Sequence, residues 1–429
     1  MPLFLTARPA QPAVSRSVTF TLAGRVFLLA VFAALVTLRI PGVLQGRLWA
    51  EDGLFLLDAL RLPWWQALTT PHTGYIDVVA SGAMLIVTHA TDLEHVALAS
   101  VLMALIIQLC PAVLLVTSRC EWLRPRWVLL IALLLILAPP IAGEVWLSPV
   151  TSQYHLMVCT GLILAFAVGT GPAGAFQILL LALAGLTGPG PALTAPLFVI
   201  RAYLDRSWPR AIQAAVLSAG ALIEIAVFWM HPEPNRHLGI GVTLLLRVIY
   251  VKNLLVPFLG PYWAFLVANG LGKASILGNW PLLPVVVSLL ALIGLTVAVV
   301  TTRAREVQWL YVAALVMMVL SYFGTLGGQA NLQNIYFGGR YYYAPQVLLN
   351  LTLLGVARTG PAIGRGLAIV LVSWLLLVGI KTYRSVNPEM SQGPSWRDQV
   401  NLWRSDRGRA VTLWPPTFQI HLDALASSP

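Results

Sequence analysis

The stretch "RVFLLAVFAALVTLRIPGVLQGRLWAEDGLFLLDAL", residues 25–60, decides the fold class of this chain. It begins with an apolar run, which we place at residues 24–41, and continues into two adjacent carboxylates, Glu51 and Asp52. Such a run predicts a helix that crosses a membrane, because a bilayer core takes about 20 apolar residues per helix. The two acids therefore lie beside a bilayer, where charged groups are costly and usually functional.

The composition places the rest of the chain in a bilayer as well. The 429 residues are 58% hydrophobic and 10% charged, with a mean hydropathy of +0.80, whereas soluble domains carry about a quarter charged residues. The net charge of +11 comes from Arg residues scattered between apolar segments. This scatter argues against a nucleic-acid partner and favours loops at an anionic membrane surface.

We therefore expect an all-α integral membrane protein with about 11 transmembrane helices, in a range of about 10 to 13. The expected spans are 24–41, 95–117, 127–144, 156–170, 173–188, 190–204, 210–230, 282–300, 307–325, 344–358 and 366–383. Residues 74–91 and 241–270 are apolar but interrupted by charges and Gly, so we expect interfacial or re-entrant segments there.

Five groups of Arg residues predict the orientation. The groups are Arg16 with Arg25, Arg119 to Arg126, Arg201 to Arg210, Arg303 with Arg305, and Arg358 with Arg365. With the spans above, all five fall on one side, which the excess of positive charge assigns to the cytoplasm. If residues 74–91 crossed the membrane instead, the Arg119 to Arg126 loop would lie outside.

This orientation divides the chain into three parts. We expect a cytoplasmic N-terminal segment at 1–23, a transmembrane domain at 24–384 and an outer C-terminal tail at 385–429. The outer loops are 42–94, 145–155, 231–281 and 326–343.

Glu51 and Asp52 open the first outer loop. Lost solvation beside an apolar layer raises the pKa of a carboxyl group toward the range of a general base. The pattern of "EDGLFLLDAL" predicts a helix with Glu51, Phe55 and Asp58 on one face and Asp52 elsewhere. A purely structural alternative is an N-cap by Asp52.

Polar residues also gather in later outer segments. The segment "PHTGYIDVV" (71–79) contributes His72, Tyr75 and Asp77, and "GEVWLSPVTSQYHL" (143–156) contributes Glu144, Gln153, Tyr154 and His155. Arg340, in "NIYFGGRYYYAP" (334–345), could hold a phosphate in bidentate fashion, and Lys252 adds positive charge. Turns, wet loops and interfacial anchors remain alternative explanations for each segment.

The order of these pieces resembles the GT-C glycosyltransferases, which are multispanning enzymes that take a sugar from a polyprenyl-phosphate donor on the outer membrane face. The phrase "WAEDG" followed by "TGY" looks most like uncharacterised bacterial members. The resemblance covers roughly residues 20–200 and 335–350.

The resemblance implies a transfer of sugar to a glycan, lipid or protein acceptor at the outer face of the bacterial cytoplasmic (inner) membrane. It implies that Asp52 or Glu51 is the catalytic carboxylate, with Asp52 accepting the proton of the acceptor hydroxyl. Many members carry Lys in a Gly-Pro hairpin, but "LTGPGP" (186–191) has none, which shifts donor-phosphate binding to Arg340, with Lys252 or His155. The residues that would bind the sugar or the acceptor are His72, Tyr75, Asp77, Glu144, Gln153 and Tyr154. Members differ in their use of a divalent metal, so a metal is possible here.

Two other functions are compatible with the sequence. Glu224 within the 210–230 span is the residue that suggests a transporter or lipid flippase, and a scaffold of envelope assembly is a third reading. An enzyme should gather its polar residues at one face, whereas a transporter should place them along a path.

Overall fold

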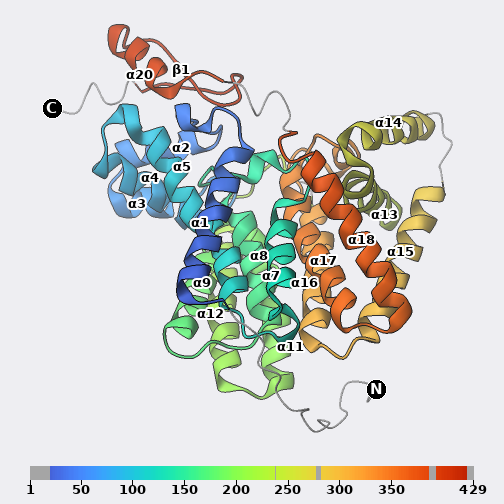
Figure 1. Ribbon diagram of the computed structural model, residues 1–429. Coiled ribbons are helices and arrows are strands. Elements are labelled where there is room, and N and C mark those ends of the chain that lie inside the picture. Colours follow the sequence, from blue (N-terminus) through green and yellow to red (C-terminus); the bar gives the residue numbers. More distant parts are fainter. Residues whose placement is uncertain (1–19, 237, 277–281, 386–392, 423–429) are drawn as a thin grey trace.

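The computed structural model describes residues 20–236, 238–276, 282–385 and 393–422 (Figure 1). Its described residues are mostly helical, and two short strands, β1 (Val411–Thr412) and β2 (Gln419–Ile420), pair antiparallel. Seven described helical segments are long and apolar enough to cross a membrane: Leu22–Arg39, Leu93–Thr117, Trp208–Met230, Val242–Ala274, Leu283–Val300, Arg305–Phe323 and Ala362–Lys381. The expected all-α membrane fold is confirmed, while Arg16 and the rest of 1–19 lie outside the described residues.

The centre of the helix bundle is α17 (Gly339–Thr359), which is buried along most of its length. It packs against α16 (Arg305–Phe323), α18 (Ala362–Lys381), α8 (Ser152–Ala165) and α7 (Arg126–Leu137). A helix surrounded in this way buries side chains on every face, and its buried amides Gln346 and Asn350 hydrogen-bond to each other at 2.8 Å.

The other upright helices lie around this centre (Figure 1). They include α1 (Leu22–Arg39), α9 (Pro172–Gly185), α12 (Trp208–Met230) and α15 (Leu283–Val300), while α6 (Cys110–Thr117) packs on α8 and α11 (Ala195–Asp205) packs on α12. Four expected spans are short helices, since α7, α8, α9 and α11 have 12, 14, 14 and 11 residues. The number of crossings therefore stays a prediction.

The segment expected to be interfacial or re-entrant at 241–270 is an interrupted helix. It consists of α13 (Val242–Ile249), a π-helical stretch η5 (Tyr250–Leu255) and α14 (Val256–Ile276). The chain breaks within α14 at Gly260, whose φ of +76° favours glycine, and Pro261 follows. Its length and composition also fit a membrane span, so its place relative to the bilayer remains a prediction.

The described Arg groups meet at one end of the bundle. The guanidinium of Arg126 lies 5.2 Å from the Phe20 ring, at the start of α1. Arg358 lies over Trp127, and Arg201 lies over Trp309 near the start of α16. These contacts join the Arg groups expected on the cytoplasmic side.

The opposite end of the bundle carries four helices of the first outer loop and the segment after it (Figure 1). They are α2 (Asp52–Arg61), α3 (Trp64–Thr69), α4 (Val78–Ala90) and α5 (Val96–Gln108). Because α4 packs mainly on α2, α3 and α5 and makes a smaller contact with the bundle at α8, it need not cross. The side of the membrane on which either end lies stays a prediction.

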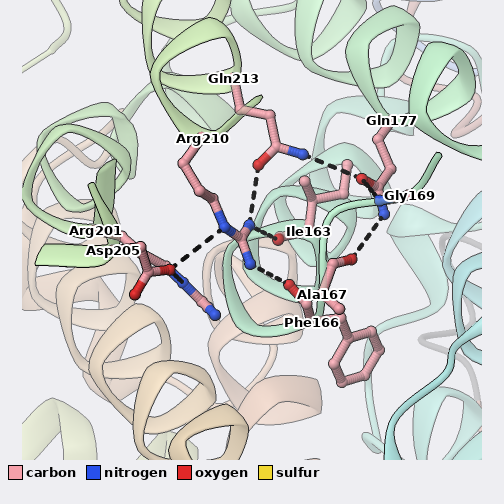
Figure 2. Close-up of polar contacts among 9 residues, drawn as sticks. All are labelled: Ile163, Phe166, Ala167, Gly169, Gln177, Arg201, Asp205, Arg210 and Gln213. Carbon is pink, nitrogen blue, oxygen red and sulfur yellow. Dashed lines mark hydrogen bonds and ion pairs between the residues drawn. The ribbon is translucent and has the colours of Figure 1, made fainter. Parts of the chain in front are cut away.

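A polar network anchors α8 at the Arg-rich end (Figure 2). Arg210 of α12 donates from Nη1 to the carbonyl of Ile163 at 2.9 Å and from Nη2 to that of Phe166. Carbonyls in the last turn of a helix have no helical donor, so Arg210 satisfies them. The network thereby fixes the helix whose other end reaches the cavity described below.

The C-terminal segment builds a second hydrophobic core over the first outer loop. It contains α20 (Trp396–Ser405), β1 and β2, and its apolar side chains pack with residues of α2, α4 and α5. The indole N–H of Trp396 donates to the carbonyl of Leu93 at 2.7 Å, and Arg404 forms an ion pair with Glu94. The tail and the first loop therefore fold as one unit.

Candidate functional site

A cavity of about 720 Å³ lies where the first loop meets the bundle. Its walls come from α2, the turn at 72–75, the start of α8, α10 (Pro189–Ala192), α11, α12, the end of α16 and the start of α17. Its volume is typical of sites for small molecules. Six of the residues predicted from sequence line it: Glu51, His72, Tyr75, Gln153, Tyr154 and Arg340.

Glu51 and Arg340 form an ion pair in the wall of this cavity. Glu51 occupies the N-cap position of α2, and its Oε1 lies 3.2 Å from Nη1 of Arg340. The backbone N–H of Arg340 donates to Oε1 of Glu144 at 2.5 Å. The Nε atom of Arg340 is buried and has no hydrogen-bond partner among the described residues. A guanidinium held at its backbone and with a free donor is suited to a phosphate.

Asp52 lies behind the cavity wall, which differs from its expected catalytic placement. It is 1% exposed, and its Oδ1 accepts the backbone N–H of Val150 at 3.1 Å. Burial raises the pKa of Asp52 to about 7, against the opposing effect of the Val150 bond, a Ser148 hydrogen bond and nearby Arg47. Asp52 ties two outer loops together, while Glu51 is the acid that reaches the cavity. The alternative N-cap role for Asp52 is not observed, since Glu51 holds that position.

A tight turn presents His72 and Tyr75 to the cavity. The two residues exchange backbone hydrogen bonds of 2.9 and 3.2 Å, and Thr73 and Gly74 between them have φ of +50° and +84°. Two positive φ values define a type I′ turn, and Thr73 is strained there because it has a side chain. Nε2 of His72 lies 2.7 Å from Oδ2 of Asp58. The face of α2 with Glu51, Phe55 and Asp58 thus turns toward the cavity.

Asp77 and Glu224 hold the backbone around the cavity. Oδ1 of Asp77 caps α4 by accepting the Ala80 N–H at 2.8 Å, and burial raises the pKa of Asp77 well above its usual range. Oε2 of Glu224 accepts the Ile76 N–H at 3.3 Å. Asp77 is fully buried and does not line the cavity, so its placement does not match the expected sugar-binding role.

The Gly-Pro hairpin is fixed against α8. The N–H of Gly188 donates to the carbonyl of Ile76 at 2.8 Å. A Cβ at Gly188 would lie 2.5 Å from Oε1 of Gln153, and its φ is +72°. Glycine here lets the hairpin pass close to Gln153 at the cavity wall.

Three more predicted residues do not reach the cavity. Nζ of Lys252 donates to the carbonyls of Asn334, Ile335 and Phe337 at 2.9, 3.0 and 2.6 Å. His155 is packed between the rings of Trp146 and Tyr343, and neither of its ring nitrogens has a hydrogen-bond partner among the described residues. Glu144 is buried behind Arg340. Lys252 and His155 are therefore buried away from the cavity in this structure, and the expectation that they bind a donor phosphate stays a prediction.

Two charged residues of the cavity wall, Arg236 and Glu224, were not given site roles from the sequence. Arg236 lies with its guanidinium carbon 5.7 Å from the Tyr75 ring and donates to the carbonyl of Gly324 at 3.1 Å. Only its positive charge in an outer loop could have suggested it. Glu224, which suggested a transport path, lines this same cavity.

The far side of the cavity is apolar and reaches the outside of the bundle. Leu222 and Trp229 of α12 line the cavity and are 67% and 79% exposed. Val199 of α11 also lines the cavity and is 52% exposed. In a membrane, such side chains face lipid, so the cavity meets the lipid at this wall.

Within the described residues, no three His, Cys, Asp or Glu side chains are grouped so that they could hold a metal ion.

No protein-family model matches the chain, and no curated protein matches it. Among solved structures, the chain is similar to arabinosyltransferase EmbB from Mycobacterium smegmatis, determined by cryo-EM, with 16% identity and a TM-score of 0.32. The alignment covers 89% of this chain and 42% of that chain, so the chain spans less than half the length of EmbB. The fold and the cavity themselves define a multi-pass helical membrane protein with a largely apolar cavity that carries a few charged groups and meets the lipid.

Proposed function

We propose that this protein is a membrane glycosyltransferase of the GT-C type, which transfers a sugar from a polyprenyl-phosphate donor to a glycan, lipid or protein acceptor at the outer face of the bacterial cytoplasmic membrane. One observation carries the proposal: Glu51, Arg340 and His72 face a single cavity whose other wall meets lipid. A polyprenyl-phosphate sugar has a charged head group and an apolar chain, so its site needs charged groups on one wall and contact with lipid on the other. The gathering of polar groups at one place favours an enzyme over a transporter.

The donor phosphate binds between two arginines. Arg340 enters from α17 and Arg236 from the loop after α12, and both line the cavity. Guanidinium groups hold phosphate oxygens through paired N–H donors. The polyprenyl chain follows the apolar wall past Leu222 and Trp229 into the bilayer.

Glu51 supplies the carboxylate for the transfer step. The acceptor hydroxyl oxygen attacks the anomeric carbon, and its proton passes to Glu51. The bond between the anomeric carbon and the phosphate oxygen breaks, and the electron pair leaves with the phosphate. Arg340 and Arg236 stabilise the charge that develops on this leaving group. Hydrogen bonds from Tyr75 and Gln153 orient the sugar.

The test is incubation of the purified protein, in lipid vesicles, with radiolabelled polyprenyl-phosphate sugars, with transfer and hydrolysis both scored. The wild type should consume donor, and Glu51→Gln should not. The matched control is Glu121→Gln, which makes the same change at an exposed carboxylate outside the cavity and should retain turnover. Movement of labelled lipid across the bilayer without cleavage would instead establish a flippase.

A further inference from the structure

We propose that the C-terminal segment 393–422 positions Glu51, and that it does so by clamping the chain on both sides of this residue. The inference rests on the proposed function, in which the carboxylate of Glu51 must be held close to the reacting atoms. It assigns a role in the reaction to residues that lie about 360 positions further along the chain.

The first half of the clamp is a backbone pairing just before Glu51. The N–H of Trp414 donates to the carbonyl of Leu48 at 3.0 Å, and the N–H of Ala50 donates to the carbonyl of Trp414 at 2.7 Å. Trp49 and Trp414 thus form an isolated parallel bridge, which holds residues 48–50 against the tail. The carbonyls of Trp49 and Ala50 in turn accept the first N–H groups of α2, so the tail sets where this helix begins.

The second half of the clamp covers Gly53, two residues beyond Glu51. A Cβ at Gly53 would lie 2.5 Å from Cδ1 of Leu413 and 3.0 Å from Cγ2 of Ile420. The tail therefore rests directly on the backbone of α2, and glycine at position 53 allows this close approach. This contact explains the glycine in "WAEDG".

Arg47 adds a charge to the same layer. Its guanidinium carbon lies 4.5 Å from the Trp49 ring and 6.0 Å from the Trp414 ring, and the side chain is 1% exposed. Burial lowers the pKa of Arg47 to about 10, with Asp52 and Glu144 opposing the shift, so Arg47 remains a cation at neutral pH. Trp414 of the tail thereby helps to enclose the positive charge of Arg47 near Asp52.

The clamp is continuous with the cavity wall. Phe55 and Val150 belong to the second hydrophobic core with Leu413 and Trp414, and both also line the cavity. A shift of the tail would move the cavity wall with it. Because misplacement by about 1 Å costs an enzyme up to about 100-fold in rate, the tail affects turnover more than donor binding.

The test pairs a clash with its relief. Gly53→Val places methyl groups against Leu413, and we expect kcat to fall by about tenfold or more while the Kd for polyprenyl phosphate stays within about twofold. Gly53→Val with Leu413→Ala removes the closer of the two contacts, while the 3.0 Å contact with Ile420 remains, and should recover part of kcat. Gly241→Val is the matched control, because a Cβ at Gly241 meets nothing within 4 Å. A normal kcat in Gly53→Val, or a loss that Leu413→Ala does not relieve, would overturn the proposal.

A second measurement is independent of turnover. The three native cysteines are buried, so a Glu51→Cys variant reports on position 51 through its rate of reaction with a soluble thiol reagent. We expect Gly53→Val to raise this rate about threefold or more and Leu413→Ala to reverse the change. An unchanged labelling rate would refute the clamp, whereas an inactive wild type with altered labelling would refute only the glycosyltransferase proposal.

Discussion

Glu51 and Arg340 are separated by 289 positions in the chain, yet their charged atoms lie 3.2 Å apart in the cavity wall. Each is the ion-pair partner of the other when no substrate is bound. In the proposed reaction, a donor phosphate at Arg340 competes with the Glu51 carboxylate. Binding of the donor would then also free Glu51 to accept a proton.

This competition predicts that Glu51→Gln binds polyprenyl phosphate more tightly while losing transfer. Removal of a competing carboxylate from a partly exposed pair should improve Kd by about threefold to fivefold, which corresponds to about 1 kcal/mol. Titration of both proteins with polyprenyl phosphate, and with polyprenol as the control without phosphate, measures the effect. Equal affinities for polyprenyl phosphate would show that Glu51 does not restrain Arg340.

Arg340→Lys keeps the positive charge but loses the planar pair of donors. We expect the Kd for polyprenyl phosphate to weaken by about tenfold and transfer to fall with it. Polyprenol binding in the same variant separates loss of phosphate recognition from general damage. If lysine substitutes without loss, Arg340 is only an anchor at the membrane surface.

Asp52 predicts a specific dependence of stability on pH. Its pKa in the folded protein is raised to about 7, so between about pH 4 and pH 7 the unfolded chain has released this proton and the folded protein still holds it. Stability should fall as pH rises through this window, because ionisation of the buried carboxyl is resisted. Asp52→Asn cannot ionise and should flatten this part of a plot of Tm against pH.

The same variant should retain part of its transfer activity, in contrast to Glu51→Gln, because Asn can still accept the Val150 N–H. An unchanged pH slope would show that Asp52 is not the buried group, and full loss of transfer would return the catalytic role to Asp52.

Lys252→Met should destabilise the protein without weakening donor binding. The change leaves three carbonyls between 334 and 337 without their shared cationic donor, at a cost of about 2 kcal/mol or more. Thermal unfolding in detergent, beside a titration with polyprenyl phosphate, separates the two effects. A weaker Kd at unchanged Tm would place Lys252 at the phosphate after all.

The Arg-rich end of the bundle should be cytoplasmic and the tail should lie outside. A reporter fused at residue 122 should read cytoplasmic, and one fused after residue 422 should read outer. The reverse result at residue 122 would mean that the whole bundle has the opposite orientation. The reason is that Arg126, Arg358 and Arg201 lie at the same end of the bundle.

Apolar runs predicted the helices well, because each run must be buried in lipid or protein wherever it lies in the fold. The face of α2 was predictable for the same reason, since Glu51, Phe55 and Asp58 follow the helical repeat. Arg340 could be chosen because its charge adjoins a long apolar segment.

The distinction between Glu51 and Asp52 was not available from the sequence. Adjacent residues of a helix differ in direction by about 100°, and the orientation of α2 depends on its packing against α4 and against Leu413 and Ile420 in the distant tail. The burial of Lys252 likewise depends on the chain at 334–337, which no local pattern indicates.

Leu222 and Trp229 lie both in the cavity wall and on the lipid-facing surface. This placement affects how the protein would be assayed. A substrate that enters there arrives by lateral diffusion, so its effective concentration is a mole fraction of the surrounding lipid rather than a molarity in solution. An apparent KM would then scale with the amount of lipid or detergent in the sample. Kinetic constants for this protein should be compared only at a fixed ratio of substrate to lipid.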